Sequence, residues 1–130
     1  MLSHVTIGSN DLPRAVKFYD ALLATLGIIR YETDLEHGLA GYAFAPATTP
    51  QFWLLRPING APASVGNGVT VAFEAPNRRI VDAFHAAGLK AGAIDEGAPG
   101  VRPHYHPHYY GAYLRDVEGH KICCACHKEP

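Results

Sequence analysis

The chain has 130 residues, of which 48% are hydrophobic and 18% are charged, and its formal net charge is −1 at pH 7. This length suits one ordinary domain, which can bury a hydrophobic core without disulfides or a structural metal. The near-neutral charge excludes the strongly basic surface that attracts nucleic acids or anionic membranes, so neither is an expected partner. The longest apolar run, residues 21–29, is also far shorter than the roughly 20 residues that cross a bilayer.

The N-terminal residues and the cysteines indicate the cellular compartment. The opening MLSHVTIGSND becomes polar too early for a secretory signal. The three cysteines are an odd number crowded into one stretch, which is not the framework of a small secreted domain. We therefore expect a cytoplasmic protein with reduced thiols.

The first half of the sequence predicts the order β-α-β-β-β. Residues 2–8 alternate like a short strand, and residues 9–27 have helical spacing, with Asp11 as N-cap and Gly27 as the C-terminal stop. Gly or Pro residues separate three further expected strands: IIRYETD (28–34), LAGYAFA (39–45) and QFWLLRP (51–57).

The second half predicts the same order after a stretch rich in Pro and Gly. VTVAFEA (69–75) reads as a strand, and Asn77 caps a helix near whose end Gly88 lies. A loop rich in Gly, Pro and His and a D-V-E-G turn then separate three expected strands: LKAGAID (89–95), YYGAYLR (109–115) and HKICCACH (120–127).

The two halves are related by an internal repeat. Placing His4 on Thr70 aligns Phe18 with Phe84 in the two expected helices. We infer a single domain over residues 1–130, made of repeat one (1–57), a linker (58–68) and repeat two (69–128).

The doubled element order, the opening MLSHVTIGSNDLPRAVKFYDALLATLGI and the ending RPHYHPHYYGAYLRDVEGHKI resemble the glyoxalase, bleomycin-resistance and extradiol-dioxygenase superfamily. The segment RDVEGHKI stands where that family usually has D-P-D-G-N-x-I-E. The resemblance covers essentially the whole chain and implies an α+β fold. In that fold the two β-α-β-β-β repeats pair into a cup-shaped mixed sheet around a cavity for a small-molecule substrate. The resemblance also implies that the protein forms a homodimer.

The same resemblance implies a metal site at the floor of the cup, formed by a His or Gln and a Glu from each half. The matching positions are His4, Gln51, Thr70 and Cys123, of which only His4 is a first-choice ligand in its usual place. A thiolate at Cys123 suits zinc or another thiophilic ion, whereas Gln51 is a weak neutral ligand and Thr70 is weaker still. The site could hold one such divalent metal or no metal at all, and this ligand set favours the absence of a metal.

The stretch GHKICCACH (119–127) concentrates cysteine and histidine, but its spacing does not form a zinc motif by itself. In an extended strand Cys123 faces one side, and Cys124 and Cys126 face the other. Neighbours on one face are about 6.6 Å apart, whereas two thiolates on one zinc are at most about 4.6 Å apart. We therefore predict that Cys124 and Cys126 lie in the β core and that Cys123 faces the cavity.

The loop RPHYHPHYY (102–110) holds the second set of candidate residues. Its prolines exclude a central strand, so several of its side chains can turn toward one ligand. Histidine and tyrosine support acid–base chemistry near neutral pH, and arginine can hold a carboxylate. We predict His106 as the catalytic residue, and as substrate-binding residues Trp53, Arg102, His104, Tyr109 and Tyr110. We expect His37, His85 and His120 to be solvated.

Two functions are consistent with these residues. The first is a glyoxalase-like lyase or isomerase acting on a small oxygen-rich or carbonyl substrate, in which His4, Cys123 and the loop serve an unusual metal or a metal-free acid–base reaction. The changed ligand positions argue against an ordinary lactoylglutathione lyase and against extradiol ring cleavage. The alternative is a metal-free protein of the bleomycin-resistance type, which sequesters a small molecule between Trp53, the loop tyrosines and Arg102.

Overall fold

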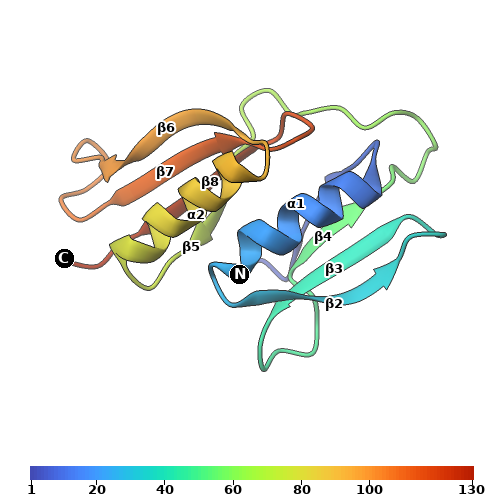
Figure 1. The fold of residues 1–130 in the computed structure, drawn as a ribbon, viewed down its shortest axis with the longest axis horizontal. Coiled ribbons are helices and arrows are strands. Elements are labelled where there is room, and N and C mark those ends of the chain that lie inside the picture. The colour runs from blue at the N-terminus through green and yellow to red at the C-terminus, as the bar shows by residue number, and fades with distance from the viewer.

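The computed structural model describes all 130 residues and contains the β-α-β-β-β order twice (Figure 1). The first copy consists of β1 (Val5–Gly8), α1 (Leu12–Ala24), β2 (Ile28–Asp34), β3 (Leu39–Phe44) and β4 (Phe52–Leu55). The second copy consists of β5 (Val71–Glu74), α2 (Arg78–Lys90), β6 (Ile94–Val101), β7 (Tyr110–Arg115) and β8 (Lys121–Cys126). The predicted α+β class and the repeated element order are confirmed.

Each copy forms one four-stranded mixed sheet, with the strand orders β1-β4-β3-β2 and β5-β8-β7-β6. The first strand of each copy pairs in parallel with the last, in the same register: Val5 lies opposite Phe52, and Val71 lies opposite Ile122. The two helices lie side by side on one face of the molecule, in front of both sheets (Figure 1). The opposite face of each sheet is therefore free of helices and available for a site.

Both helices begin where the capping residues predict. The Asp11 side chain accepts a hydrogen bond from the Arg14 backbone N–H at 3.2 Å, and the Asn77 side chain accepts one from Ile80 at 2.9 Å. Gly27, with a φ of 73°, follows the end of α1, as expected for a glycine that terminates a helix. Neither helix is both long and apolar enough to span a membrane.

Several strand boundaries differ from the prediction, most of all those of β6 and β1. The strand expected at 89–95 is wrong, because Leu89 and Lys90 continue α2 and the strand β6 begins only at Ile94. β6 then runs through Pro99, which the sequence placed in a loop; a proline is tolerated there because β6 is an edge strand. The first strand begins at Val5 and not at residue 2, so His4 lies just before β1.

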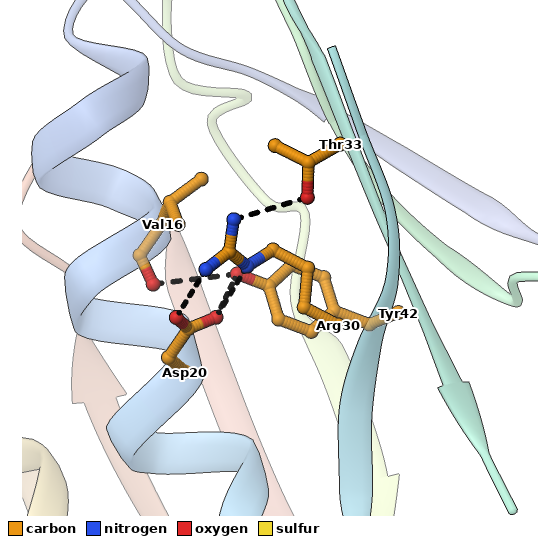
Figure 2. A network of polar contacts seen from close by, with 5 residues as sticks. All are labelled: Val16, Asp20, Arg30, Thr33 and Tyr42. Carbon is orange, nitrogen blue, oxygen red and sulfur yellow. Dashed lines mark hydrogen bonds and ion pairs between the residues drawn. The ribbon is translucent and has the colours of Figure 1, made fainter. Parts of the chain in front are cut away.

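A polar network fixes α1 to the sheet of the first copy (Figure 2). Arg30 donates two hydrogen bonds to the Asp20 carboxylate, at 3.1 and 3.2 Å, and a third to the Thr33 hydroxyl at 3.0 Å. The Tyr42 hydroxyl donates to Asp20 at 2.9 Å and also contacts the Val16 carbonyl oxygen at 3.3 Å. Burial and the bond to Asp20 raise the pKa of Tyr42, so its hydroxyl remains a donor. The network joins α1, β2 and β3.

One hydrophobic core contains residues from both copies. It comprises 21 buried residues, and at its centre the rings of Phe52 from β4 and Phe73 from β5 lie 5.3 Å apart. Polar contacts join the copies as well: Tyr19 of α1 donates to the buried Asp116 at 2.5 Å, and the His120 Nε2–H donates to the Gly8 carbonyl oxygen at 2.7 Å. The turn between β7 and β8 is thus attached to the first copy.

Two of the histidines expected to be solvated are not. His85 is only 8% exposed, and its Nε2 lies 2.9 Å from the Asp95 carboxylate. His120 is half-buried by its bond to Gly8. That expectation is wrong for both residues, because neither contact partner is close to the histidine in sequence.

The cysteines of β8 lie where the alternation predicts. Cys124 and Cys126 are buried in the shared core, whereas Cys123 faces the other side of the sheet. Burial, and to a smaller extent the neighbouring Cys123 and Cys126, raise the pKa of the Cys124 thiol to about 12. This thiol therefore remains protonated over the whole neutral range.

The raised Cys124 pKa predicts a loss of stability in mild alkali. Above a pH of about 9 the unfolded chain releases the thiol proton while the folded chain keeps it, so folding becomes less favourable as pH rises. Between about pH 8 and about pH 10 we expect Cys124 to remove about 1 kcal/mol from the free energy of unfolding. Urea unfolding at the two pH values measures this change. The Cys124→Ala variant should show a smaller loss, and equal losses in both proteins would contradict the prediction.

Candidate functional site

Two hollows open on the helix-free faces of the sheets, one in each copy. The first has a volume of about 480 Å³ and is lined by Ser3, His4, Thr6, Thr49, Pro50, Trp53 and Leu55. The second has a volume of about 370 Å³ and is lined by Thr70, Ala72, Tyr105, Tyr109, Tyr113, Lys121 and Cys123. The hollow that His4 and Trp53 share does not include Cys123, so these candidate residues are divided between the two copies.

Strand alternation explains why these side chains face away from the helices. In β8, Ile122 and Cys124 enter the core, so Lys121 and Cys123 project to the opposite face. In β7, Leu114 enters the core and Tyr113 projects beside Cys123, its direct partner across the two strands. The second hollow is therefore built on two paired, rigid strands.

Three polar groups contact one another in the second hollow. The Tyr109 and Tyr113 hydroxyl oxygens are 2.8 Å apart, and the Tyr109 oxygen lies 3.6 Å from the Cys123 sulfur. The Lys121 ammonium lies 5.5 Å from the centre of the Tyr113 ring, within the range of a cation–π contact. The hollow therefore combines aromatic walls with hydroxyl and ammonium donors.

The second hollow keeps these groups protonated. Burial raises the pKa of Tyr109, and its hydrogen bonds to Tyr113 and Cys123 raise it further. Burial also raises the pKa values of Tyr113 and of the Cys123 thiol. At neutral pH the hollow offers neutral phenols and a neutral thiol, with Lys121 as the cation among its lining residues. Such a surface suits an oxygen-bearing ligand and does not supply a nucleophilic thiolate.

The residues present do not fit a bound divalent metal. No three side chains of His, Cys, Asp or Glu converge anywhere in the molecule in a way that could hold a metal ion. Cys123 is 1% exposed, and its raised pKa opposes the thiolate form that a metal requires. His4 is exposed and lies in the other hollow, with its Nδ1 3.0 Å from the Ser3 hydroxyl.

Gln51 does not occupy the position equivalent to Cys123. Phe52 and Ile122 hold the same register position in the two sheets, so the residues that follow them, Trp53 and Cys123, are equivalent. Gln51 precedes β4 and lines a different hollow, which also contains Glu74 of the second copy. The structure therefore brings neither Gln51 nor Trp53 together with Cys123 in the second hollow.

His106 lies beside the second hollow and not among its lining residues. The His108 backbone N–H donates to His106 Nδ1 at 3.2 Å, so the His106 proton is on Nε2, which lies 2.9 Å from His127 Nδ1. The His106 ring contacts the Tyr109 ring edge to face, with 5.7 Å between their centres. Any effect of His106 on a ligand in this hollow would thus pass through Tyr109.

The other loop candidates have different surroundings. Tyr110 points to the helix face, where its hydroxyl donates to Asp82 of α2 at 2.6 Å. The Arg102 guanidinium donates to the carbonyl oxygens of Ala98 and Gly100 at 2.8 and 2.9 Å. It also lies 5.6 Å from the Tyr113 ring centre. His104 packs on Tyr105 at 4.3 Å between ring centres and does not line the hollow.

Sequence reasoning missed Tyr105, Tyr113 and Lys121 as lining residues of this hollow. A signal for two of them was present in the alternation of β7 and β8, because Tyr113 and Lys121 lie on the face opposite the core residues Leu114 and Ile122. No comparable signal existed for Tyr105, which belongs to an irregular loop.

Comparison with known proteins gives consistent results. The family model for the glyoxalase/bleomycin resistance protein/dioxygenase superfamily matches residues 1–124. A search of curated protein sequences gave no match. Among solved structures, a glyoxalase/bleomycin resistance protein from Albidiferax ferrireducens T118 is 43% identical, with 98% of this chain and 99% of that chain covered and a TM-score of 0.85.

More distant structures share the fold. A family enzyme from Burkholderia phytofirmans PsJN is 16% identical over 97% of this chain and 98% of that chain, with a TM-score of 0.70. A lactoylglutathione lyase from Agrobacterium tumefaciens is 18% identical over 97% of this chain and 92% of that chain, with a TM-score of 0.67. With a family model that covers residues 1–124, the chain belongs to the glyoxalase/bleomycin resistance protein/dioxygenase superfamily.

Proposed function

We propose that the protein binds a small aromatic or carbonyl compound in the second hollow without the help of a metal. The observation that carries this proposal is the group formed by Tyr109, Tyr113 and Cys123 beside Lys121. The tyrosine rings provide flat apolar walls, and the ammonium and the one hydroxyl whose proton is not used in the Tyr109–Tyr113 bond can donate to a ligand oxygen. This combination of apolar walls and a few polar groups is typical of small-molecule sites.

The role proposed for Lys121 is electrostatic. Its ammonium would attract a carbonyl or phenolate oxygen, while one phenol of the Tyr109–Tyr113 pair donates a hydrogen bond to that oxygen. The thiol of Cys123 supports Tyr109 from within the sheet and need not react. Binding of this kind is the sequestration activity of the bleomycin-resistance type, applied to an oxygen-bearing ligand.

A second candidate is a metal-free lyase or isomerase. The observation that favours it is the hydrogen-bonded pair His106–His127, whose rings both contact Tyr109. The two rings pack against the Tyr109 ring and would orient it, while the Tyr109 hydroxyl, which is bonded to Tyr113 and Cys123, would be the acid–base group that meets a substrate in the hollow. In that case His106 would act as a positioning residue for Tyr109.

The binding proposal is tested with 4-hydroxybenzaldehyde as a probe, followed by NMR of the full chain. We expect its addition to shift the signals of Tyr109, Tyr113 and Cys123, with and without EDTA. Tyr113→Phe removes one hydroxyl and keeps the ring, so it should weaken binding about 5–10-fold. Lys121→Met should weaken binding to a similar extent.

The control is Tyr31→Phe, because Tyr31 is an exposed tyrosine of β2 outside both hollows. The single tryptophan, Trp53, reports on the first hollow independently. If the probe quenches Trp53 fluorescence and its affinity is unchanged in Tyr113→Phe, the site is in the first hollow and the proposal fails.

The enzyme candidate has its own assay, the formation of lactoylglutathione from the hemithioacetal of methylglyoxal and glutathione. On the binding proposal we expect no turnover by protein treated with EDTA. If turnover persists in the presence of EDTA and is lost in His106→Ala, the sequestration proposal is wrong and metal-free acid–base catalysis is supported.

A further inference from the structure

We propose a second binding site, for an amphipathic organic anion, in the groove between α1 and α2 on the helix face. The occupant is a small alkyl or aryl chain that carries one carboxylate or sulfonate. This site is separate from both hollows on the sheet faces and does not depend on the function proposed for them.

The groove is a hollow of about 520 Å³ with an apolar floor. The floor is formed by Phe18 and Ala21 of α1, Ala87 of α2, Ala91 at the C-cap of α2, and Val117 of the turn after β7. The spacing of the lining residues on each helix, at i, i+3 and i+4, places them on one stripe facing the other helix. Small alanines leave room where larger side chains would close the gap between the helices.

Three basic side chains surround this floor: Arg14, Lys17 and Lys90. None of them forms an ion pair within 4 Å; the arginines paired with carboxylates are Arg30 and Arg115. No acidic residue lines the groove. The groove is therefore an apolar surface with an unbalanced positive rim.

The nearby carboxylates are already bound to other groups. Asp20 holds Arg30 and Tyr42, and Glu118 accepts hydrogen bonds from the backbone N–H groups of Asn10 and Asp11. Arg30 balances the charge of Asp20, and neither carboxylate lines the groove or forms an ion pair with its basic side chains. A ligand that carries both a negative charge and an apolar chain complements what the groove presents.

The chemistry of the rim argues against larger occupants. A second copy of the chain docked by the same face would bring identical cations together, which is unfavourable. A nucleic acid would meet only three cations around an apolar floor, on a chain whose net charge is −1. The volume of the groove instead lies in the range of small-ligand sites.

The test uses octanoate as the probe and 1-octanol as its uncharged counterpart. In NMR of the full chain, we expect octanoate to shift backbone signals of residues 14–21 and 87–91 first, and 1-octanol to bind more weakly. The double variant Lys17→Glu/Lys90→Glu should weaken octanoate binding about tenfold, since it reverses two charges of the rim. Ala21→Trp should also block binding by filling the groove, because Ala21 is exposed and the larger ring can occupy the space without entering the core.

The matched control is Arg79→Glu/Lys128→Glu, which changes the net charge by the same amount at two exposed residues that do not line the groove. We expect this variant to change octanoate affinity less than twofold. Equal weakening in the two double variants would mean that only overall charge matters, and the proposal would be overturned. It would also be overturned if octanoate shifted signals of the sheet hollows, such as Tyr113 or Trp53, in place of the groove signals.

Discussion

Replacing Asp116 with alanine is expected to lower the free energy of unfolding by about 3–5 kcal/mol, the largest effect of any single change considered for this protein. Asp116 is 4% exposed and accepts hydrogen bonds from the Tyr19 hydroxyl at 2.5 Å and from the backbone N–H groups of Glu118 and His120 at 2.8 and 3.0 Å. The variant leaves all three donors without their acceptor. A buried donor that loses its partner costs about 1–3 kcal/mol.

A smaller change separates the parts of this network. Tyr19→Phe removes one donor and leaves Asp116 bonded to the turn, so we expect a loss of about 1.5–3 kcal/mol. Burial and the neighbouring Asp116 raise the pKa of Tyr19, so the phenol is a donor throughout the neutral range. Urea unfolding measures both variants and their combination. The combined loss should fall short of the sum, because the two residues share one bond.

Asp34→Ala is the matched control for Asp116→Ala, since Asp34 accepts its hydrogen bonds from the exposed His37 in a surface turn. Its cost should be far smaller than that of Asp116→Ala, because a solvent-exposed contact of this kind contributes little to stability. If Asp116→Ala cost no more than Asp34→Ala, the contact between Asp116 and Tyr19 would contribute little to stability. The turn between β7 and β8 would then not hold the two copies together.

Replacing Gly88 with valine is expected to destabilise the protein by about 1–3 kcal/mol by overpacking the contact of α2 with β7 and α1. A Cβ at this position would overlap the Leu114 side chain and lie 3.3 Å from the Leu22 Cδ1 atom. Both leucines are fully buried, so neither can move aside without disturbing the core. A glycine is unfavourable inside a helix, but at position 88 it lets α2 approach Leu114 and Leu22 closely.

Ala86→Val is the control for Gly88→Val, because Ala86 is exposed on the same helix. It carries the same β-branched side chain and should cost about 0.5 kcal/mol through helix propensity alone. Thermal or urea unfolding compares the two. Equal losses would show that the space next to Gly88 can accommodate a side chain and that the close approach of α2 to Leu114 of β7 is not needed.

Local patterns predicted the secondary structure well where each segment carries its own signal. Asp11 and Asn77 marked both helix starts, and the alternation in β8 separated Cys123 from Cys124 correctly. The exception was β6. There the helix continued through Gly88 to Lys90. This glycine leaves room for a close contact with Leu114, 26 residues away in sequence, and the sequence gives no sign of that contact.

The candidate site was less predictable than the fold. Alternation indicates the face of a strand but not how far one sheet lies from the other, so His4 and Cys123 could not be assigned to different hollows from the sequence. The direction of a loop side chain depends on its contacts: Tyr110 turned to Asp82, whereas Tyr109, the preceding residue, turned to Tyr113. Tyr19 and Asp116, 97 positions apart, had no local signal at all.

The shared core has a consequence for how a duplicated chain behaves. Each copy repeats the other in its element order, yet the 21 buried residues form one cluster that neither copy could complete alone. Melting one copy would expose the apolar surface of the other, so the two should be lost together in a single cooperative step. The two copies thus share their shape, but the protein should unfold as one cooperative unit.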